Sequence, residues 1–278
     1  MDHEDPTPRP GEPDPVTDPV ASRLLVDADL SGGRWTRVDL RGVVGRGVDL
    51  EGADLDSPWL ADGGPVLING VDVVGLVEAE LDRRFPGRAL RRARALEGPD
   101  GLRAAWAAVE AAWADLGRRA DALPLTALAE SVDGEWSFTQ TLRHLVMATD
   151  VWLGRGIRGL GDEAYHPLGL PNAEFATDGY DLSVFVTHPP AHADVLAARA
   201  DRQRQVREFL AEADEADLEQ ERRNPWAPSH PETVRSCLHV ILQEEWQHLR
   251  YAARDLAVVA AALEAGSGQV DDAVGQHG

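Results

Sequence analysis

The sequence contains no lysine, a single cysteine and no long apolar run. All 27 basic residues are therefore arginines, and 48 acidic residues outnumber them, which gives a formal net charge of -21. Binding of nucleic acid without sequence preference needs clustered positive charge, so this balance argues against it. Basic residues that are arginine throughout are typical of a GC-biased genome.

Two of these absences, together with the first ten residues, indicate the cellular compartment of the protein. The single cysteine, Cys237, excludes an internal disulfide framework. A membrane-spanning helix needs about 18 or more consecutive apolar residues, and the chain has no such run. The opening residues, MDHEDPTPRP, lack the basic and apolar stretches of a secretory signal. The sequence therefore predicts a cytoplasmic protein that has neither nucleic acid nor a membrane as a partner.

The residues that are present suit a folded protein with two extended ends. The 278 residues are 43% hydrophobic, which is enough for a buried core. Residues 1–22 are rich in proline and acidic side chains, and residues 264–278 are rich in glycine and polar side chains. Segments of this kind cannot bury enough apolar surface to order themselves, so we expect disordered tails at both ends.

Residues 23–60 contain an internal repeat of five residues. In steps of five from Asp27, the segment reads DADLS, GGRWT, RVDLR, GVVGR, GVDLE and GADLD. The central positions are Leu30, Trp35, Leu40, Gly45, Leu50 and Leu55. A period of five fits neither a helix nor a strand, but it suits a small solenoid whose central side chains point inward. The segment resembles the pentapeptide-repeat pattern A(D/N)Lxx, which implies a β-solenoid-like coil of little more than one turn.

Residues 61–97 are predicted to connect this repeat to a larger domain. The stretch PVLINGVDV, residues 65–73, indicates two short strands joined by a turn at Asn69-Gly70. The stretch VGLVEAELDRRF that follows predicts a helix, which Pro86-Gly87 would end.

From about residue 98 the sequence becomes helical. Apolar side chains recur at spacings of three and four, as on one face of a helix; they are Leu102, Trp106, Val109, Trp113 and Leu116. Three further helices are predicted, one after the N-cap Ser137, one over residues 191–213 and one over residues 232–263. A long loop, residues 158–188, separates the second helix from the third. This pattern predicts a mainly α protein in which residues 98–263 form a four-helix bundle.

Three ionisable side chains on two of these helices form a candidate metal site. Glu244 and His248 are four residues apart, so they lie on one face of the last helix. His144 lies in an apolar stretch of the second helix. Bundles build metal sites in this way, and three protein ligands leave one position open for water or substrate. The alternatives are a hydrogen-bonded core histidine at 144 and an ordinary surface ion pair at 244 and 248.

The segments WSFTQTLRHLVMATDVWLGR and EEWQHLRYAARDL resemble the DinB-like superfamily. The resemblance covers roughly residues 98–262. Members are four-helix bundles in which a histidine on the second helix and an HxxxH pair on the last helix bind a divalent metal. The resemblance implies that His144, Glu244 and His248 are the ligands here, with Glu244 in place of the commoner first histidine. Glu245 is a weaker candidate for that position. Because a carboxylate is a harder ligand than imidazole, Zn, Ni, Fe and Mn are all candidate metals.

The resemblance also implies an activity. The superfamily includes transferases and isomerases that use mycothiol, bacillithiol or glutathione, and a bound metal there helps to activate the thiol. The expected function is thiol S-transfer or isomerisation on a small electrophilic substrate, with mycothiol as a candidate cofactor. Hydrolysis with an activated water is less favoured. Bundles of this kind often pair, so a homodimer is favoured.

Three more residues are candidates for acid–base roles or substrate contacts. Tyr251 and Asp255 follow His248 by three and seven residues, so both could lie on the face of the site. Asp255 could orient the ring of His248, or it could pair with Arg254 instead. His166 lies on the long loop, beside aromatic and apolar residues, where a general acid could reach a bundle mouth.

The remaining histidines and the cysteine are expected to be structural. His239 is out of phase with His248 along the last helix, and His188 and His192 lie at the start of the third helix. Cys237 lies in an apolar context that indicates a buried, inert thiol.

Two other classes of function remain open from the sequence. In the first, the bundle binds a metal or a small ligand without catalysis, and the repeat segment is an interaction surface. In the second, the protein is an interaction module built on the acidic repeat. The second class predicts that deletion of residues 1–60 abolishes function whereas His144→Ala does not.

Overall fold

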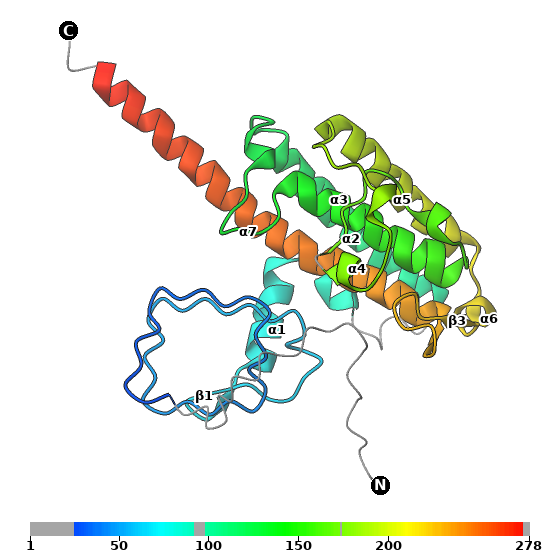
Figure 1. Ribbon diagram of the computed structural model, residues 1–278, viewed down its shortest axis with the longest axis horizontal. Coiled ribbons are helices and arrows are strands. Elements are labelled where there is room, and N and C mark those ends of the chain that lie inside the picture. The colour runs from blue at the N-terminus through cyan, green and yellow to red at the C-terminus, as the bar shows by residue number, and fades with distance from the viewer. Residues whose placement is uncertain (1–24, 92–97, 173, 275–278) are drawn as a thin grey trace. The chain divides into compact units, whose positions relative to one another are not determined.

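The computed structural model describes residues 25–91, 98–172 and 174–274. It divides into two compact units, Met1–Pro58 and Trp59–Gly278, which are described separately. Figure 1 shows the elements of each unit. The tail predicted over residues 1–22 lies outside the described residues. None of the described helices combines the length and the hydrophobicity that a bilayer span needs.

The first unit is a coil that turns at every fifth residue. Its residues with positive φ are Asp27, Gly32, Arg37, Gly42, Gly47 and Gly52, with φ between 53° and 73°. Three of its turns are closed by backbone hydrogen bonds of 3.1 Å, such as that from the Gly33 amide to the Leu30 carbonyl. Because only the left-handed conformation reverses the chain so tightly, the period of five in the sequence becomes the period of the corners. This confirms the predicted coil, which is the blue trace in Figure 1.

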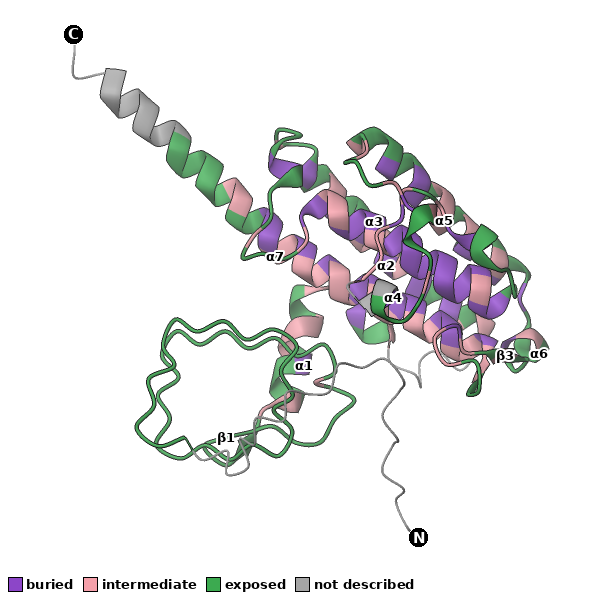
Figure 2. Ribbon diagram, viewed as in Figure 1, coloured by how far each residue is buried: buried purple, intermediate pink, exposed green. Residues whose placement is uncertain are grey.

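The coil buries none of its described residues. Most central side chains are less exposed than their neighbours, with Leu40 at 44% and Leu50 at 47% against 66% for Val43 and 60% for Val48, but none is buried. Figure 2 shows this segment as exposed throughout. The coil therefore has no buried interior among its described residues. A coil this short has no layer above or below it to cover the middle, so each side chain keeps its contact with water.

A hairpin and a helix open the second unit at the predicted positions. Strands β1 (Leu67–Ile68) and β2 (Val71–Asp72) pair antiparallel through a turn in which Asn69 and Gly70 both have positive φ. Such a two-residue turn matches the twist of the strands. Helix α1 (Val74–Arg84) follows, and then a short 3-10 helix, η1 (Arg88–Arg91). Buried Arg88 joins the two helices, because it pairs with Glu78 and Asp82 at 2.7 Å each.

Four long helices form the bundle. They are α2 (Pro99–Ala120), α3 (Phe138–Thr149), α5 (His192–Glu212) and α7 (Val234–Val274). Helices α2 and α3 each contact both α5 and α7, as Figure 1 shows. The predicted stripe on α2 is confirmed, since its five members from Leu102 to Leu116 are all buried. Full burial of one such side chain contributes roughly 1.5–3 kcal/mol, so this core, drawn in purple in Figure 2, holds the bundle together.

Helix α3 begins at a capping box and continues as a π-helix. The Ser137 side chain accepts from the Gln140 amide, and the Gln140 side chain accepts from the Ser137 amide. The chain then widens into a π-helical segment, η4 (Asp150–Ile157), which the sequence did not predict. Gly154 lets this segment pack closely, because a Cβ there would lie 2.9 Å from the Cβ of Ala164.

Several short elements also differ from the expectation. They are η3 (Ala127–Ala129), η5 (Asp162–Ala164), α4 (Glu174–Thr177), η6 (Leu182–Val184), α6 (Glu215–Leu218), β3 (Glu221–Arg223) and β4 (Pro231–Thr233). Strands β3 and β4 pair antiparallel, with Arg222 opposite Glu232. Their charged residues and proline gave no strand signal, because the pairing depends on the loop between them rather than on a buried face.

The C-terminal end of the bundle needs a correction. A disordered tail is predicted over residues 264–278, but α7 continues to Val274, and residues 275–278 lie outside the described part. The run AAALEA that precedes Gly266 has high helix propensity and extends the helix past Leu256, its last buried residue among those described. Beyond it the helix continues through Gly266 and Gly268, each of which costs about 1 kcal/mol, and propensity does not account for that last part.

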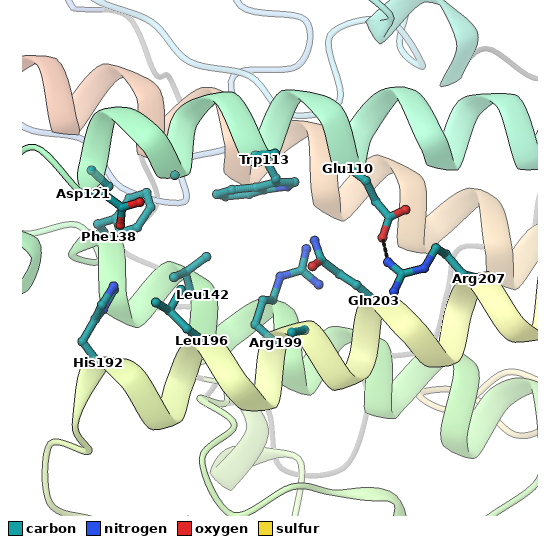
Figure 3. Close-up of a pocket in the computed structure, with 14 residues that line it drawn as sticks. Glu110, Trp113, Asp121, Phe138, Leu142, His192, Leu196, Arg199, Gln203 and Arg207 are labelled. Carbon is teal, nitrogen blue, oxygen red and sulfur yellow. Dashed lines mark hydrogen bonds and ion pairs between the residues drawn. The ribbon is translucent and has the colours of Figure 1, made fainter.

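Helices α2, α3 and α5 line an open pocket of about 490 Å³. Figure 3 shows Trp113 of α2 facing Leu196 and Arg199 of α5, with Leu142 of α3 drawn between Trp113 and Leu196. This pocket and the predicted metal cluster involve different side chains of the bundle.

Candidate metal site

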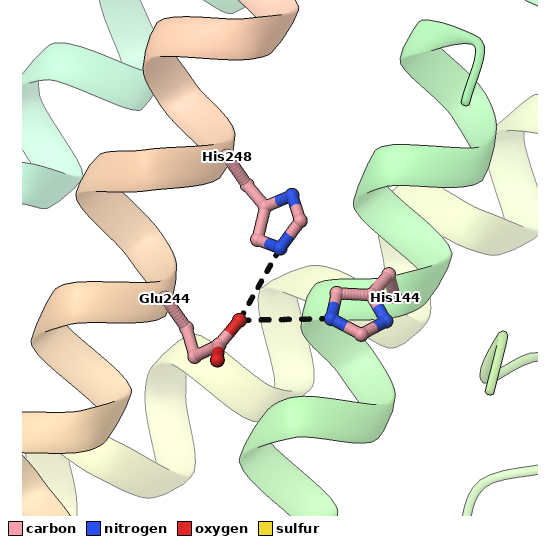
Figure 4. A group of neighbouring side chains, drawn as sticks. All are labelled: His144, Glu244 and His248. Carbon is pink, nitrogen blue, oxygen red and sulfur yellow. Dashed lines mark ion pairs between the residues drawn. The ribbon is translucent and has the colours of Figure 1, made fainter. Parts of the chain in front are cut away.

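The three predicted ligands come together between α3 and α7. The Oε2 atom of Glu244 lies 3.2 Å from Nε2 of His248 and 3.6 Å from Nε2 of His144. One potential donor atom from each residue lies within 4.8 Å of the other two. Figure 4 shows both imidazoles pointing at the same carboxylate oxygen. Among the described residues, this is the group of His, Cys, Asp or Glu side chains whose donor atoms lie close enough together to hold one metal ion.

The local structure of each helix explains the convergence. Glu244 and His248 are one turn apart on α7, so their side chains project from the same face. His144 lies in the second turn of α3, on the side that packs against α7. The centroids of the two imidazole rings are 4.7 Å apart. Two helices that pack against each other therefore suffice to build the cluster.

The tautomer of His144 is set by the long loop. Its Nδ1 lies 3.1 Å from the carbonyl oxygen of Leu170. Because a carbonyl only accepts, Nδ1 carries the proton and Nε2, the atom nearest Glu244, can offer a lone pair. Second partners of this kind commonly orient metal-binding histidines.

Arg143 holds this loop in place. It is buried, and its guanidinium donates to the carbonyls of Leu168 at 2.9 Å and Gly169 at 3.3 Å. The amide of Leu170 donates in turn to the carbonyl of Arg143 at 3.1 Å. The loop carbonyl that faces His144 is therefore fixed by hydrogen bonds from its own neighbours.

Charge and burial suit a cation at this cluster. Burial raises the pKa of Glu244, but the two imidazoles outweigh it, so the pKa lies well below its ordinary value and the carboxylate is ionised. Burial lowers the pKa of His248, against the opposing effect of Glu244, which favours the neutral imidazole. A bound metal would take the place of the protons that the imidazoles donate to Glu244, because coordination requires an ionised carboxylate and neutral imidazoles. Two imidazoles and one carboxylate fit Zn, Ni, Fe or Mn, and three protein ligands leave further coordination positions open.

Trp136 covers the cluster, and the sequence did not point to it. Its ring centroid lies 4.4 Å from that of His144 and 5.8 Å from that of His248. Trp136 directly precedes the N-cap Ser137, so the capping box fixes where the chain enters α3. A residue ahead of a helix has no helical phase, and for this reason periodicity could not place it at the site.

Of the three acid–base candidates, the structure places Tyr251 beside the cluster and gives Asp255 and His166 other partners. Tyr251 lies beside the cluster, with its ring edge-on to His248 at 5.7 Å between centroids. Asp255 is ion-paired with Arg254 at 2.7 Å, which is the alternative that the sequence left open. His166 belongs to another network, because its amide donates to Asp150 and its Nδ1 accepts from the Leu168 amide.

The other candidates also find separate partners. Glu245, the weaker candidate ligand, pairs with Arg199 and not with the cluster. His192 begins α5, where its Nδ1 lies 2.9 Å from the Thr139 hydroxyl. Cys237 is buried, and burial raises the pKa of its thiol to about 11, so it remains a protonated thiol.

The fold and the cluster together define a helical-bundle protein with a candidate metal centre of two histidines and one glutamate. Residues 108–252, more than half of the chain, match the profile of the DinB superfamily, so the chain belongs to this superfamily. Residues 24–57 match the profile of pentapeptide repeats, which describes eight copies of the unit. No curated protein and no solved structure shows a significant match. The DinB superfamily is typically metal-binding, which agrees with the donor set found here.

Proposed function

We propose that the protein is a metal-dependent enzyme. It would use a low-molecular-weight thiol to transfer a group or to isomerise a small electrophilic substrate. The observation that supports this proposal is the convergence of His144, Glu244 and His248, with the lone pair of His144 directed by the Leu170 carbonyl. A divalent cation held by these residues would lower the pKa of a thiol or water bound beside it. Mycothiol is the candidate thiol.

The side chains around the cluster have separate tasks in this proposal. Trp136 forms an aromatic wall over both imidazoles, against which a substrate can pack. Tyr251 packs against Arg250 and Arg254, whose guanidinium carbons are 4.6 and 5.5 Å from its ring centroid. In the proposal its hydroxyl serves as the acid or base at the cluster, because its ring lies edge-on to His248.

In the reaction, the thiol loses its proton to solvent or to a nearby base, and its sulfur forms a bond to an electrophilic carbon. In a transfer, the bond from that carbon to a leaving group breaks and the leaving group takes the electron pair. In an isomerisation, the sulfur adds to a carbon–carbon double bond, whose π electron pair moves onto a conjugated carbonyl oxygen. After rotation about the resulting single bond this pair returns, the sulfur–carbon bond breaks, and the thiolate takes a proton from solvent or the base. Hydrolysis would use water in place of the thiol.

The direct test combines metal analysis with a thiol assay. Purified protein should contain close to one equivalent of a divalent metal per chain, and His144→Ala should lose it. His239→Ala is the matched control, because it removes an imidazole from α7 that lies outside the cluster. Unchanged metal content in His144→Ala would remove the proposed site.

Activity is then measured with a small electrophile in two assays: loss of free thiol reports transfer, and conversion of the substrate at constant free thiol reports isomerisation. We expect turnover with metal-loaded protein and no turnover with His144→Ala. A thermal-shift screen of mycothiol, bacillithiol and glutathione selects the cofactor. If metal is retained but no thiol or ester substrate turns over, the enzymatic assignment fails while the site survives.

One observation favours a second candidate function, a metal or small-ligand binding protein without catalysis. Asp255 and His166 are engaged elsewhere, which leaves Tyr251 as the one predicted acid–base candidate at the cluster among the described residues. In this case Tyr251→Phe would leave ligand affinity unchanged. The enzyme proposal instead expects Tyr251→Phe to lower turnover by about tenfold or more while metal is retained.

A further inference from the structure

A second polar centre lies beside the pocket between α2, α3 and α5. Arg199 is only 4% exposed, and its Nη2 pairs with buried Glu245 of α7. Its Nε and Nη1 atoms have no hydrogen-bond acceptor among the described residues. A buried guanidinium with two unmet donors is costly to a fold, so such groups normally face a ligand or an ordered water.

Arg199 lines the pocket of about 490 Å³. Figure 3 shows its guanidinium reaching from α5 toward Trp113 and Gln203, near the middle of the pocket. The neighbouring walls are apolar and come from Trp113, Phe138, Leu142 and Leu196. Most of the surface that lines the pocket is apolar, as in small-molecule sites of this size.

The remaining charged groups of the pocket lie toward its two ends. Glu110 pairs with Arg207 at one end, as the dashed line in Figure 3 marks. Asp121 lies at the other end, near His192, and is exposed. The partly compensated charge of Arg199 therefore suits a single negative charge better than a dianion, and the apolar walls require an apolar body.

We propose that this pocket binds an organic carboxylate, with the carboxylate at Arg199 and an aliphatic or aromatic body against Trp113, Phe138 and Leu142. This site is separate from the metal cluster. Neighbouring residues of α7 point to the two sites, because Glu244 faces His144 whereas Glu245 faces Arg199.

The test compares carboxylates with their neutral amides. Phenylacetate and hexanoate, against phenylacetamide and hexanamide, are titrated into the full-length protein and followed by calorimetry and tryptophan fluorescence. Carboxylates should bind saturably, and the amides about tenfold or more weakly, since they lack the charge that Arg199 recognises. Equal binding of acid and amide, or no saturation by either acid, would overturn the proposal.

Two matched variants locate the binding. Ala200 lines the pocket and Ala197 does not, although both are exposed on α5. Ala200→Phe should therefore abolish carboxylate binding, and Ala197→Phe should retain it. Neither change touches the Arg199–Glu245 pair, so the test does not depend on Arg199→Met, which could fail to fold. Equal effects of the two phenylalanines would contradict the assignment.

A third variant separates this site from the metal cluster, which could itself bind a carboxylate. In His144→Ala the metal site is lost, and carboxylate binding should persist with unchanged affinity. Loss of binding in this variant would assign the carboxylate to the cluster and overturn the pocket proposal, without a bearing on the proposed function.

Discussion

The repeat coil and the helical bundle are both periodic in sequence, but only the bundle converts its period into burial. In the coil, a positive φ at every fifth residue turns the chain, yet Leu40 remains 44% exposed. In the bundle, spacings of three and four put Leu102 and Leu145 in a core where both are fully buried. A period therefore determines the local backbone, whereas burial requires a second layer that the period does not supply.

The same contrast explains where chemistry can develop. A buried environment shifts pKa values and excludes water, so imidazoles and carboxylates become useful ligands there. The coil carries several acidic residues, but all of its described residues are exposed. The candidate metal centre and the Arg199 pocket both lie in the bundle.

The largest expected effect comes from the same substitution made in both regions. Leu145→Ala removes a fully buried side chain and should lower the free energy of unfolding by about 2–5 kcal/mol. Leu40→Ala in the coil should change it by about 0.5 kcal/mol or less, because the side chain is already hydrated. Urea denaturation followed by far-UV circular dichroism measures both. Equal losses would break the comparison.

Metal binding should stabilise the bundle by a similar amount. A divalent metal that binds only the folded state, at a concentration of about 100 to 1,000 times its dissociation constant, raises the free energy of unfolding by roughly 2.7–4.1 kcal/mol. Calorimetric melting with and without zinc should show the rise in wild type and in His188→Ala, but not in His248→Ala. A rise in all three would place the metal elsewhere.

Burial at Asp150 predicts a pH dependence of stability. Burial raises its pKa to about 6, despite hydrogen bonds from Arg202 and the His166 amide. Between about pH 4 and pH 6 the folded protein holds this proton more tightly than the unfolded chain, so rising pH costs stability. Relative to Asp150→Asn, which does not titrate, wild type should lose on the order of 2–3 kcal/mol across this window. A difference between the urea midpoints of wild type and Asp150→Asn that stays constant with pH would contradict the assignment.

The smallest effect compares two side-chain caps. Ser137 caps α3 in the bundle, and Asp29 accepts from the Ser31 amide in the coil at 2.9 Å. Ser137→Ala should cost about 1 kcal/mol, since the Gln140 amide loses the hydroxyl that accepts from it. Asp29→Ala should leave the unfolding midpoint of the bundle unchanged. A larger effect of the coil variant would show that the coil supports the fold.

The sequence was sufficient for those features that depend on spacing along one element. Glu244 and His248 are one turn apart, and the buried stripe of α2 follows from its period, so both could be predicted. His144 was proposed from its place in an apolar stretch of the second helix, and the resemblance to the DinB-like superfamily supported it. The π-helical widening after Thr149 carries no such spacing, and it was missed.

The features that the sequence could not supply depend on contacts between elements. Leu170 orients His144 through a backbone carbonyl, which any residue type would provide. Trp136 reaches both imidazoles only because α3 packs on α7. Glu244 and Glu245 are the same residue type side by side, yet only the packing of α3 and α5 decides which one faces the histidines.

The most direct test of the central claim is a crystal structure of the zinc-loaded protein with an anomalous difference map. One peak should lie about 2.0–2.2 Å from Nε2 of His144, Nε2 of His248 and a carboxylate oxygen of Glu244. A peak bound by other residues, or a His144 ring turned away from Glu244, would contradict the account.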